Sequence, residues 1–397
     1  MTACLMAVSV FRSAEADKAA DIGGFMEKLK AAVISCGMIA NKAHIPAYQY
    51  YSDRCEVTAV CDVNEQTARQ TAARFNIPKW YTDTEKMLAD EKPDIVSVCV
   101  PNALHKAMTM LALSYGAHVI CEKPAALNYA DAGEMYAEAE RLGKTLVACQ
   151  VTRYNPEFMF AREMFEQDVL GDVYYSEFAI VRRRGVPKWG AFHKKSASGG
   201  GVMCDLGVHL LDSALWIMNS PRVKSVSGFT SSYLAKNEQN IVMSLKESGA
   251  PSGVFTRQSY KPSEFEVEEF AAGSLRLDNG SAMNFKTAWA VNLPPEFSMK
   301  MAGTKAGILL PEMKILGTMG RYQADIEPRV FPEEFPFSSE VFPGHFCLTG
   351  NVLDHIIDGE ELLIRPEQTK HVTAVIEAFY RSAEEGREVM LSEIEGQ

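Results

Sequence analysis

Several features are missing from this 397-residue sequence, and each absence excludes a class of protein. No apolar run approaches the roughly 20 residues of a membrane-spanning helix, so we expect no segment within a bilayer. The formal net charge is −11, opposite in sign to the basic surface that binds nucleic acid. This charge argues against nucleic acid as a partner.

The nine cysteines include no C-x-x-C pair, so the sequence signals neither a zinc site nor a redox pair. Buried, reduced cysteine behaves as a small apolar residue. Five of the cysteines fall within or at the ends of strand-like runs, namely Cys36, Cys61, Cys99, Cys121 and Cys149. We therefore expect free thiols, no bound metal and a cytoplasmic protein.

Residues 1–27 differ in amino-acid composition from the rest of the chain. An apolar stretch, residues 3–11, has no preceding lysine or arginine and no clear cleavage site after it, which makes a poor signal peptide. Small and polar residues follow in 13–24. We expect residues 1–27 to be a disordered extension outside the fold.

Residues 28–150 alternate between short apolar runs and helix-like segments. Near-continuous apolar strands separated by helices are typical of a parallel sheet covered on both faces. This order predicts an α/β Rossmann domain. The expected strands are 31–36, 56–61, 94–100, 117–121 and 145–149, and the expected helices are 65–75, 103–115 and 129–142, with one more beginning at residue 39.

Residues 151–397 contain longer strand-like runs and fewer helices. Asp278-Asn279-Gly280 separates two of these runs and is a hairpin turn signal. We expect an α+β domain with a large, mostly antiparallel open sheet and helices on one face. The expected strands are 173–181, 223–233, 266–277 and 281–291, and the expected helices are 203–218 and 366–385.

A dinucleotide-binding turn is expected after the first strand, where Ser35, Gly37, Met38 and Ile39 follow one another closely. The usual fingerprint has three glycines, and here only the second is glycine. Asp62, at the end of the second strand, stands at the distance expected for a carboxylate that binds both ribose hydroxyls. No lysine or arginine follows it directly, so the sequence favours NAD over NADP.

The segment after the third strand carries Pro101, Asn102 and His105. Asn102 could cap the next helix. Alternatively, the loop passes beneath the nicotinamide ribose, with His105 nearby. Both interpretations can hold together, so all three residues are candidate cofactor contacts.

Glu122-Lys123-Pro124 follows the fourth strand. A charged surface loop is the simplest interpretation, but the carboxyl edge of a parallel sheet is where ligands bind. Burial and a nearby nicotinamide charge would lower the pKa of Lys123 and make it usable as an acid or base.

A third cluster follows the three glycines at 199–201. Glycine lets the backbone approach a ligand closely. Asp205, His209 and Asp212 share one helix face if the helix is regular. His209 suits a general base, and Asp205 could orient it or raise its pKa. Near the basic run at 182–184, Trp189 could stack on a sugar ring.

Together these motifs resemble the glucose–fructose oxidoreductase, inositol dehydrogenase and rhizopine-catabolism (Gfo/Idh/MocA) family, from about residue 29 onward. The resemblance is carried by Glu122-Lys123-Pro124, Arg153-Tyr154-Asn155-Pro156, Asp205-x-Gly207-x-His209, Asp278-Asn279-Gly280 and the segment 376–383. It implies that Lys123 acts beside the nicotinamide and that Asp205 and His209 act on the substrate.

The resemblance further implies that Arg153 and Asn155 line the substrate pocket and that the Lys123-Pro124 peptide is cis. It implies a carbohydrate-like substrate and a homodimer or homotetramer. We therefore expect an NAD-dependent oxidoreductase that transfers hydride between a secondary alcohol of a sugar, glycoside or cyclitol and NAD. Two alternatives stay open: a redox-neutral NAD-dependent glycosidase, and a non-catalytic sensor of NAD or sugar.

Overall fold

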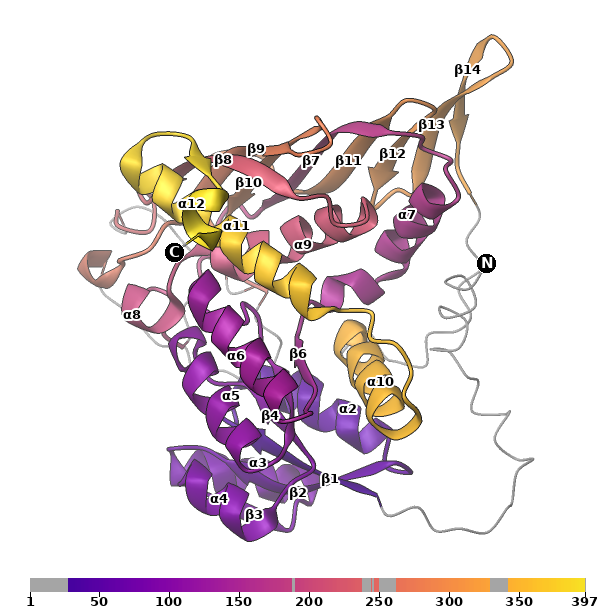
Figure 1. Cartoon of the computed structure of the whole chain (residues 1–397). Helices are drawn as coiled ribbons and strands as arrows, with labels where there is room; N and C mark the ends of the chain where they lie inside the picture. The colour runs from indigo at the N-terminus through magenta and orange to yellow at the C-terminus, as the bar shows by residue number, and fades with distance from the viewer. Residues whose placement is uncertain are drawn as a thin grey trace.

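The computed structural model of the chain describes residues 28–187, 190–237, 244, 246–249, 262–328 and 342–396. Two sheets lie at opposite ends of the molecule, with helices between them (Figure 1). The expected extension, residues 1–27, lies outside the described residues. In the part of the chain that is described, we find no helix with the length and apolar character of a membrane span.

The first sheet has six strands in the order β3-β2-β1-β4-β5-β6, and every neighbouring pair is parallel. This confirms the expected Rossmann domain. In its central strands, residues 31–34 and 95–98 are small or β-branched and fully buried. The strands are β1 (Leu29–Ile34), β2 (Cys55–Cys61), β3 (Lys79–Tyr81), β4 (Ile95–Val98), β5 (His118–Cys121) and β6 (Leu146–Ala148).

Three of the described helices of this domain begin at a side-chain cap. Asn64, Asp83 and Asn128 each accept a hydrogen bond from a backbone N–H in the first turn of the helix that follows. Strand β3 and helix α4 were not predicted. The helices are η2 (a π-helix, Ala40–His44), α2 (Ile45–Tyr50), α3 (Glu65–Phe75), α4 (Thr84–Glu91), η3 (Asn102–Leu104), α5 (His105–Ser114) and α6 (Tyr129–Arg141).

The second sheet has nine strands in the order β14-β13-β12-β11-β7-β10-β9-β8-β15. Among the described strands only β7 and β10 pair in parallel, so the expected mostly antiparallel sheet is confirmed. The strands are β7 (Val173–Val181), β8 (Val223–Ser231), β9 (Phe270–Leu277), β10 (Ala282–Ala288), β11 (Glu296–Gly303), β12 (Gly307–Leu310), β13 (Lys314–Met319), β14 (Tyr322–Ile326) and β15 (Val389–Met390).

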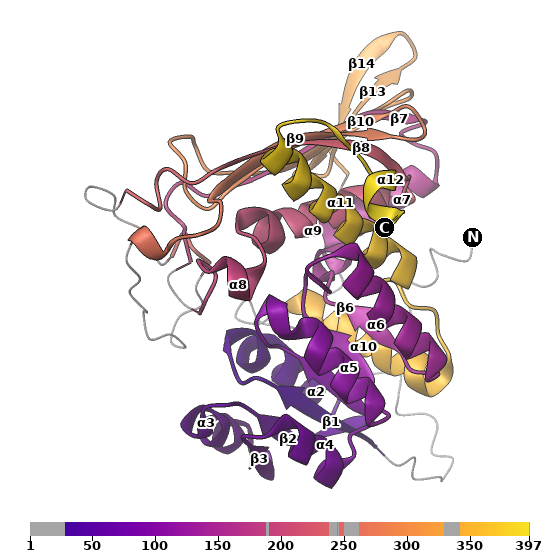
Figure 2. The same ribbon diagram turned by 60° about the vertical axis from the view of Figure 1, so that its left-hand side comes forward.

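Helices cover one face of this sheet and leave the other open (Figure 2). The covered face carries a buried row across five strands, formed by Val226, Leu275, Met283, Ser176 and Met301. The next row points the other way and is largely exposed; it is formed by Ser227, Ser274, Asn284, Glu177 and Lys300. The expected homodimer or homotetramer stays a prediction.

The helices of the second half include several that were not predicted, among them α7 and α10. They are η4 (Val151–Tyr154), α7 (Pro156–Glu166), α8 (Lys195–Ser198), η5 (a π-helix, Met203–Gly207), α9 (Val208–Ile217), η7 (Pro262–Glu264), α10 (Pro343–Asp358), α11 (Pro366–Glu385) and α12 (Ser392–Glu395). The helix expected over 203–218 is therefore a π-helical turn followed by an α-helix.

Helix α10 crosses back and packs on the nucleotide-binding half, beside α2 (Figure 1). Its buried side chains, including Leu348 and Val352, share one apolar cluster with Val33, Ile45 and Tyr48 of the first domain. A domain boundary near residue 150 therefore omits a helix that completes the core of the Rossmann half.

The packing of α10 leads to a prediction about two glycines inside helices. A Cβ on Gly133 in α6 would meet no atom within 4 Å, whereas a Cβ on Gly350 in α10 would overlap the Tyr51 phenol. Gly133→Ala should raise the free energy of unfolding by about 0.5–1 kcal/mol through helix propensity. Gly350→Ala should lower the free energy of unfolding by about 1–3 kcal/mol, because the clash with Tyr51 outweighs the gain in helix propensity.

Urea denaturation of the two variants checks this prediction, and each serves as the control for the other. Equal stabilisation by both alanines would contradict the packing of α10 against Tyr51.

Candidate active site

Lys123 lies where the two halves meet. It follows β5 at the carboxyl edge of the Rossmann sheet, and its Nζ is 3.1 Å from Oδ1 of Asp205 and 2.8 Å from the Asp205 carbonyl oxygen. The Lys123-Pro124 peptide is cis, as expected. The structure therefore brings two of the three predicted catalytic residues into direct contact.

Asp205 is held as a carboxylate. Its Oδ2 accepts a hydrogen bond of 2.9 Å from the indole Nε1 of Trp289. Burial alone would raise the pKa of Asp205, but the charges of Lys123 and Arg182 and the Trp289 hydrogen bond outweigh it and hold the pKa below its usual range. Trp289 was not predicted from the sequence, because nothing in its local pattern distinguishes it from a core tryptophan.

His209 is positioned by Thr152 and not by Asp205. In the described chain, its Nδ1 lies 3.2 Å from Thr152 Oγ1, while both oxygens of Asp205 are engaged by Lys123 and Trp289. The π-helical turn η5 places Asp205 outside a regular 3.6-residue register, which is why the predicted Asp205–His209 contact is wrong.

Asp205 does raise the pKa of His209, as expected, but larger effects outweigh it. Burial and the neighbouring Lys123 charge lower it to about 3, against a smaller opposing effect of Asp205. The imidazole is therefore neutral at physiological pH, and Nε2 has no hydrogen-bond partner among the described residues. The ring has one nitrogen fixed and the other available to accept a proton, but its lowered pKa makes it a weaker base than a free imidazole.

Arg153 and Asp212 form a buried pair away from this group. The Arg153 side chain is 1% exposed and makes bidentate contacts of 2.6 and 2.8 Å with Asp212. It also donates to Gln368 and to the Leu363 carbonyl. These contacts give Arg153 a structural role in joining η4, α9 and the start of α11, and we revise its assignment to the substrate pocket.

The other two expected substrate contacts differ in status. Asn155 is half-buried and precedes α7, where its carbonyl accepts the N–H groups of Phe158 and Met159 at 3.0 Å. Its contact with a substrate stays a prediction. Trp189 lies outside the described residues.

The turn after β1 is open at Gly37. A Cβ on Gly37 would approach only Ser35 Oγ, at 3.9 Å, so protein atoms do not fill this space. Asn41 donates to the carbonyls of Cys36 and Gly37 and holds the turn from inside. Ser35 has a φ of 74°, the left-handed conformation in which the fingerprint normally places glycine. The backbone thus keeps the fingerprint's shape although the residue differs.

Asp62 connects this turn to the end of β2. Its Oδ2 accepts the Cys36 N–H at 2.9 Å, and its Oδ1 accepts the Asn64 N–H at 2.8 Å. A carboxylate has about four acceptor positions, so capacity remains for ribose hydroxyls. The turn with Ser35, Gly37, Met38 and Ile39 therefore fits the cofactor expected for it.

In the loop after β4, Asn102 and His105 make contacts that differ from those expected. Asn102 does not cap its helix: its amide donates to the Ser198 carbonyl at 2.9 Å and joins the two halves. His105 is fully buried, with Nδ1 2.7 Å from the Pro124 carbonyl and Nε2 3.0 Å from the Val100 carbonyl. It braces two loops and has no exposed surface for a cofactor, so its assignment as a cofactor contact is revised.

Glu122 supports Lys123 from behind. This buried carboxylate accepts the Lys123 N–H at 3.2 Å through Oε2. Its Oε1 lies 2.9 Å from Nε2 of both His44 and His345. Neither histidine was predicted from the sequence, and His345 is 223 positions away from Glu122, beyond any local signal. Direct contact between Glu122 and a cofactor stays a prediction.

The three consecutive glycines are needed for packing. A Cβ on Gly200 would overlap the Tyr380 hydroxyl, and one on Gly201 would overlap the Glu268 carbonyl. Glu268 accepts hydrogen bonds from the Gly201 and Met203 N–H groups and from Tyr380. Close approach to a ligand, the reason expected from the sequence, is therefore not required to explain them.

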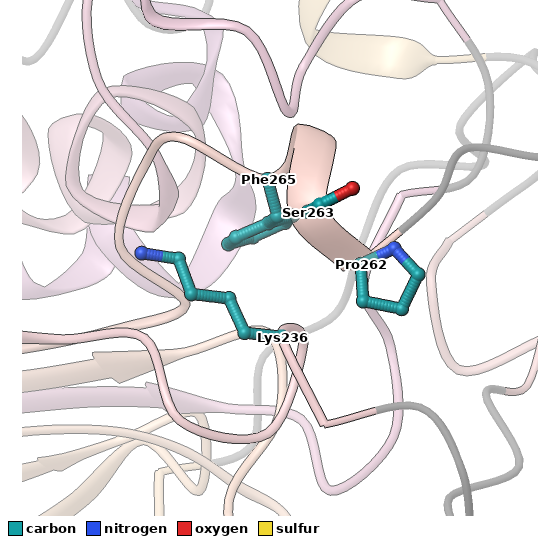
Figure 3. A pocket seen from close by; sticks show the side chains of 4 residues that line it. All are labelled: Lys236, Pro262, Ser263 and Phe265. Atoms are coloured by element: carbon teal, nitrogen blue, oxygen red, sulfur yellow. The ribbon is translucent and has the colours of Figure 1, made fainter.

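An open pocket of about 740 Å³ lies near this region (Figure 3). It is lined by Lys236, Pro262, Ser263 and Phe265. Phe265 packs edge-on against Trp289, which in turn binds Asp205. The pocket is thus separated from the Lys123–Asp205 contact by two aromatic side chains.

Three partly or fully buried histidines predict how stability depends on pH. Burial and nearby cations lower the pKa of His118 and of His371 to about 4, and that of His209 to about 3. In the unfolded chain each has a pKa of about 6.5. Between about pH 6.5 and pH 4 the unfolded state therefore binds more protons, and acidification favours unfolding.

The urea midpoint should change little from about pH 8 to pH 7 and fall clearly by about pH 5. His371→Gln, which keeps an acceptor for the Val223 N–H, should reduce this fall. A midpoint that is constant or rises on acidification to pH 5 would contradict the assigned neutral imidazoles.

Comparison with known proteins identifies the family. Residues 29–150 match the Gfo/Idh/MocA oxidoreductase family model for the NAD-binding Rossmann fold, and residues 162–391 match the model for its C-terminal alpha/beta domain. D-glucoside 3-dehydrogenase of Escherichia coli K12 is 31% identical over 368 residues, which cover 91% of this chain and 97% of that protein.

Solved structures show the same fold. Levoglucosan dehydrogenase in complex with NADH and levoglucosan aligns over 92% of this chain and all of that one, with a TM-score of 0.76 and 16% identity. Aldose-aldose oxidoreductase from Caulobacter crescentus, complexed with glycerol, aligns over 92% of this chain and all of that one, with a TM-score of 0.72 and 22% identity. The chain therefore belongs to the Gfo/Idh/MocA family of NAD-dependent oxidoreductases.

Proposed function

We propose that this protein is an NAD-dependent dehydrogenase that oxidises a secondary hydroxyl of a D-glucoside or a closely related sugar, with the hydroxyl at C3 as the first candidate. The observation that carries the proposal is the convergence of Lys123, Asp205 and His209 at the carboxyl edge of a dinucleotide-binding sheet. The substrate class is suggested by the relative that is a D-glucoside 3-dehydrogenase, which matches almost the whole chain.

The cofactor would be held by the turn around Gly37, by Asp62 and by the loop with Pro101 and Asn102. When bound, NAD supplies the hydride acceptor. Asp62 favours NAD over NADP because its carboxylate binds ribose hydroxyls and repels a 2′-phosphate. The residues that follow it, Val63, Asn64 and Glu65, carry no positive charge to offset that repulsion.

In the proposed reaction His209 accepts the proton and Lys123 stabilises the developing negative charge. As the carbinol C–H leaves as hydride, the hydroxyl proton passes to Nε2 of His209 and a carbonyl forms. Thr152 would accept a hydrogen bond from Nδ1–H and so fix the tautomer in which Nε2 is free. The Lys123 ammonium stabilises the negative charge that develops on the substrate oxygen. Asp205 holds that ammonium in place.

A substrate panel tests the proposal directly. Methyl D-glucosides, free glucose, levoglucosan and a cyclitol are incubated with NAD or NADP, and NADH absorbance and carbohydrate products are followed. We expect NADH and a keto product from a glucoside, with NADP much less effective. Cleaved glycoside without NADH accumulation would indicate the redox-neutral glycosidase, and NAD binding without reaction would indicate a sensor; either contradicts the proposal.

The variant Lys123→Met tests the proposed role of the Lys123 ammonium in turnover. Loss of the ammonium should lower kcat by about 10²–10³-fold, because charge stabilisation in the transition state is removed. NAD affinity should stay within about twofold, since the dinucleotide turn lies elsewhere. Lys86→Met, on a surface helix, is the matched control and should keep full activity. Near-normal turnover by Lys123→Met would refute the assigned role.

Two variants of Thr152 distinguish its hydrogen bond to His209 from a contribution to packing alone. Thr152→Val keeps the shape but removes the hydrogen bond to His209, and kcat should fall about 10-fold or more with little change in KM. Thr152→Ser restores the hydroxyl and should restore kcat. Equal kcat values for the valine variant and the unaltered enzyme would show that His209 needs no such partner.

A further inference from the structure

Four buried side chains gather directly behind Lys123. They come from four separate elements: His44 from η2, Glu122 from the loop after β5, Cys149 from the segment after β6, and His345 from α10. Each is less than a tenth exposed. Their potential ligand atoms all lie within 4.8 Å of one another. The proposed dehydrogenase mechanism uses none of these atoms.

The spacing of these atoms is close to that of a metal coordination shell. Oε1 of Glu122 is 2.9 Å from Nε2 of His44 and 2.9 Å from Nε2 of His345, and Sγ of Cys149 is 3.9 Å from Nε2 of His44. With Zn–N bonds of about 2.0–2.1 Å and a Zn–S bond of about 2.3 Å, neighbouring ligands in a tetrahedron are about 3.3–3.6 Å apart. For these three contacts, adjustments of a few tenths of an ångström reach that geometry.

The charges also suit a divalent cation. A Glu122 carboxylate and a Cys149 thiolate together carry two negative charges, and two neutral imidazoles add none, so a bound Zn²⁺ gives a neutral buried site. Without a cation, one oxygen of Glu122 must accept both imidazole Nε2–H groups at the same time. If Zn²⁺ bound at the two Nε2 atoms, each imidazole would stay neutral with its proton on Nδ1, and the one proton released would come from the Cys149 thiol.

The surroundings orient one imidazole as metal ligands usually are oriented. Nδ1 of His44 is 2.9 Å from Ser97 Oγ, which is also 2.9 Å from the Tyr48 hydroxyl. This contact lets His44 donate from Nδ1 and present a bare Nε2 to a metal. Among the described residues, Nδ1 of His345 has no hydrogen-bond partner, and its Nε2 makes the polar contact that joins this side chain to the cluster.

We propose that His44, Glu122, Cys149 and His345 form a structural zinc site. Four protein ligands leave no open position for substrate or water, which is the feature that separates structural from catalytic zinc. The ion would clamp α10 onto the Rossmann half and fix Glu122, whose second oxygen accepts the Lys123 N–H. No zinc motif is visible in the sequence because the four proposed ligands are far apart along the chain, at positions 44, 122, 149 and 345.

Elemental analysis of tag-free, full-length protein tests the site without reference to activity. We expect about one equivalent of zinc per chain after purification or after dialysis against zinc. Replacement of zinc by Co²⁺ should produce the intense sulfur-to-cobalt charge-transfer absorption of a thiolate ligand and the visible bands of tetrahedral cobalt. Zinc well below one equivalent after dialysis, with no cobalt spectrum, would overturn the proposal in favour of a metal-free hydrogen-bonded cluster.

Two pairs of variants locate the ion. Cys149→Ser should lose the charge-transfer band, while Cys347→Ser, a buried free thiol on α10 outside the cluster, should keep it. His345→Gln should weaken zinc binding by 10-fold or more, while His355→Gln on the same helix should not. Retention of zinc and of the band by both cluster variants would place the metal elsewhere, and the wild-type measurement stands even where a variant fails to fold.

Discussion

The active-site geometry depends on one contact, in which the Lys123 ammonium of the Rossmann half meets the Asp205 carboxylate of the second half. Both side chains are mostly removed from water, with exposed fractions of 17% and 16%. A partly buried charge without its partner is costly, so each of these residues constrains the position of the other. The contact therefore fixes how the two halves meet at the site.

The Lys123 loop is held from two sides. In front, Asp205 engages the ammonium; behind, Glu122 accepts the Lys123 N–H and is itself held by His44 and His345. Because His345 belongs to α10, a segment late in the chain completes the support of a residue early in the chain. The position of the ammonium thus reflects the packing of three regions that are far apart in sequence.

The repeating features of the fold were predictable from the sequence. The alternation of apolar strands with helices predicted the Rossmann sheet, and helix α3, strand β7 and helix α11 coincide with their expected ranges. Lys123 also follows β5 at the carboxyl edge of the Rossmann sheet, as expected. These predictions succeed because hydrophobic period and strand order are local signals.

The partners of the site residues were not predictable in the same way. Asp205 and His209 fit a regular helix in sequence, but the π-helical turn changes their relation, so Trp289 and Thr152 became their partners. Local pattern could not reveal that Arg153 would be buried against Asp212, because the pairing depends on how two helices pack. Tertiary contacts decide which polar residues face a ligand and which brace the fold.

An isotope-transfer experiment tests the central claim, which is that this site removes hydride from a carbohydrate carbon. Methyl D-glucoside carrying deuterium at C3 is incubated with NAD, and the reduced cofactor and the sugar are analysed by mass spectrometry and NMR. The account predicts deuterium at C4 of the nicotinamide and a keto group at C3 of the sugar. Product that keeps its deuterium, or loses it to water while the cofactor stays unlabelled, would contradict the account.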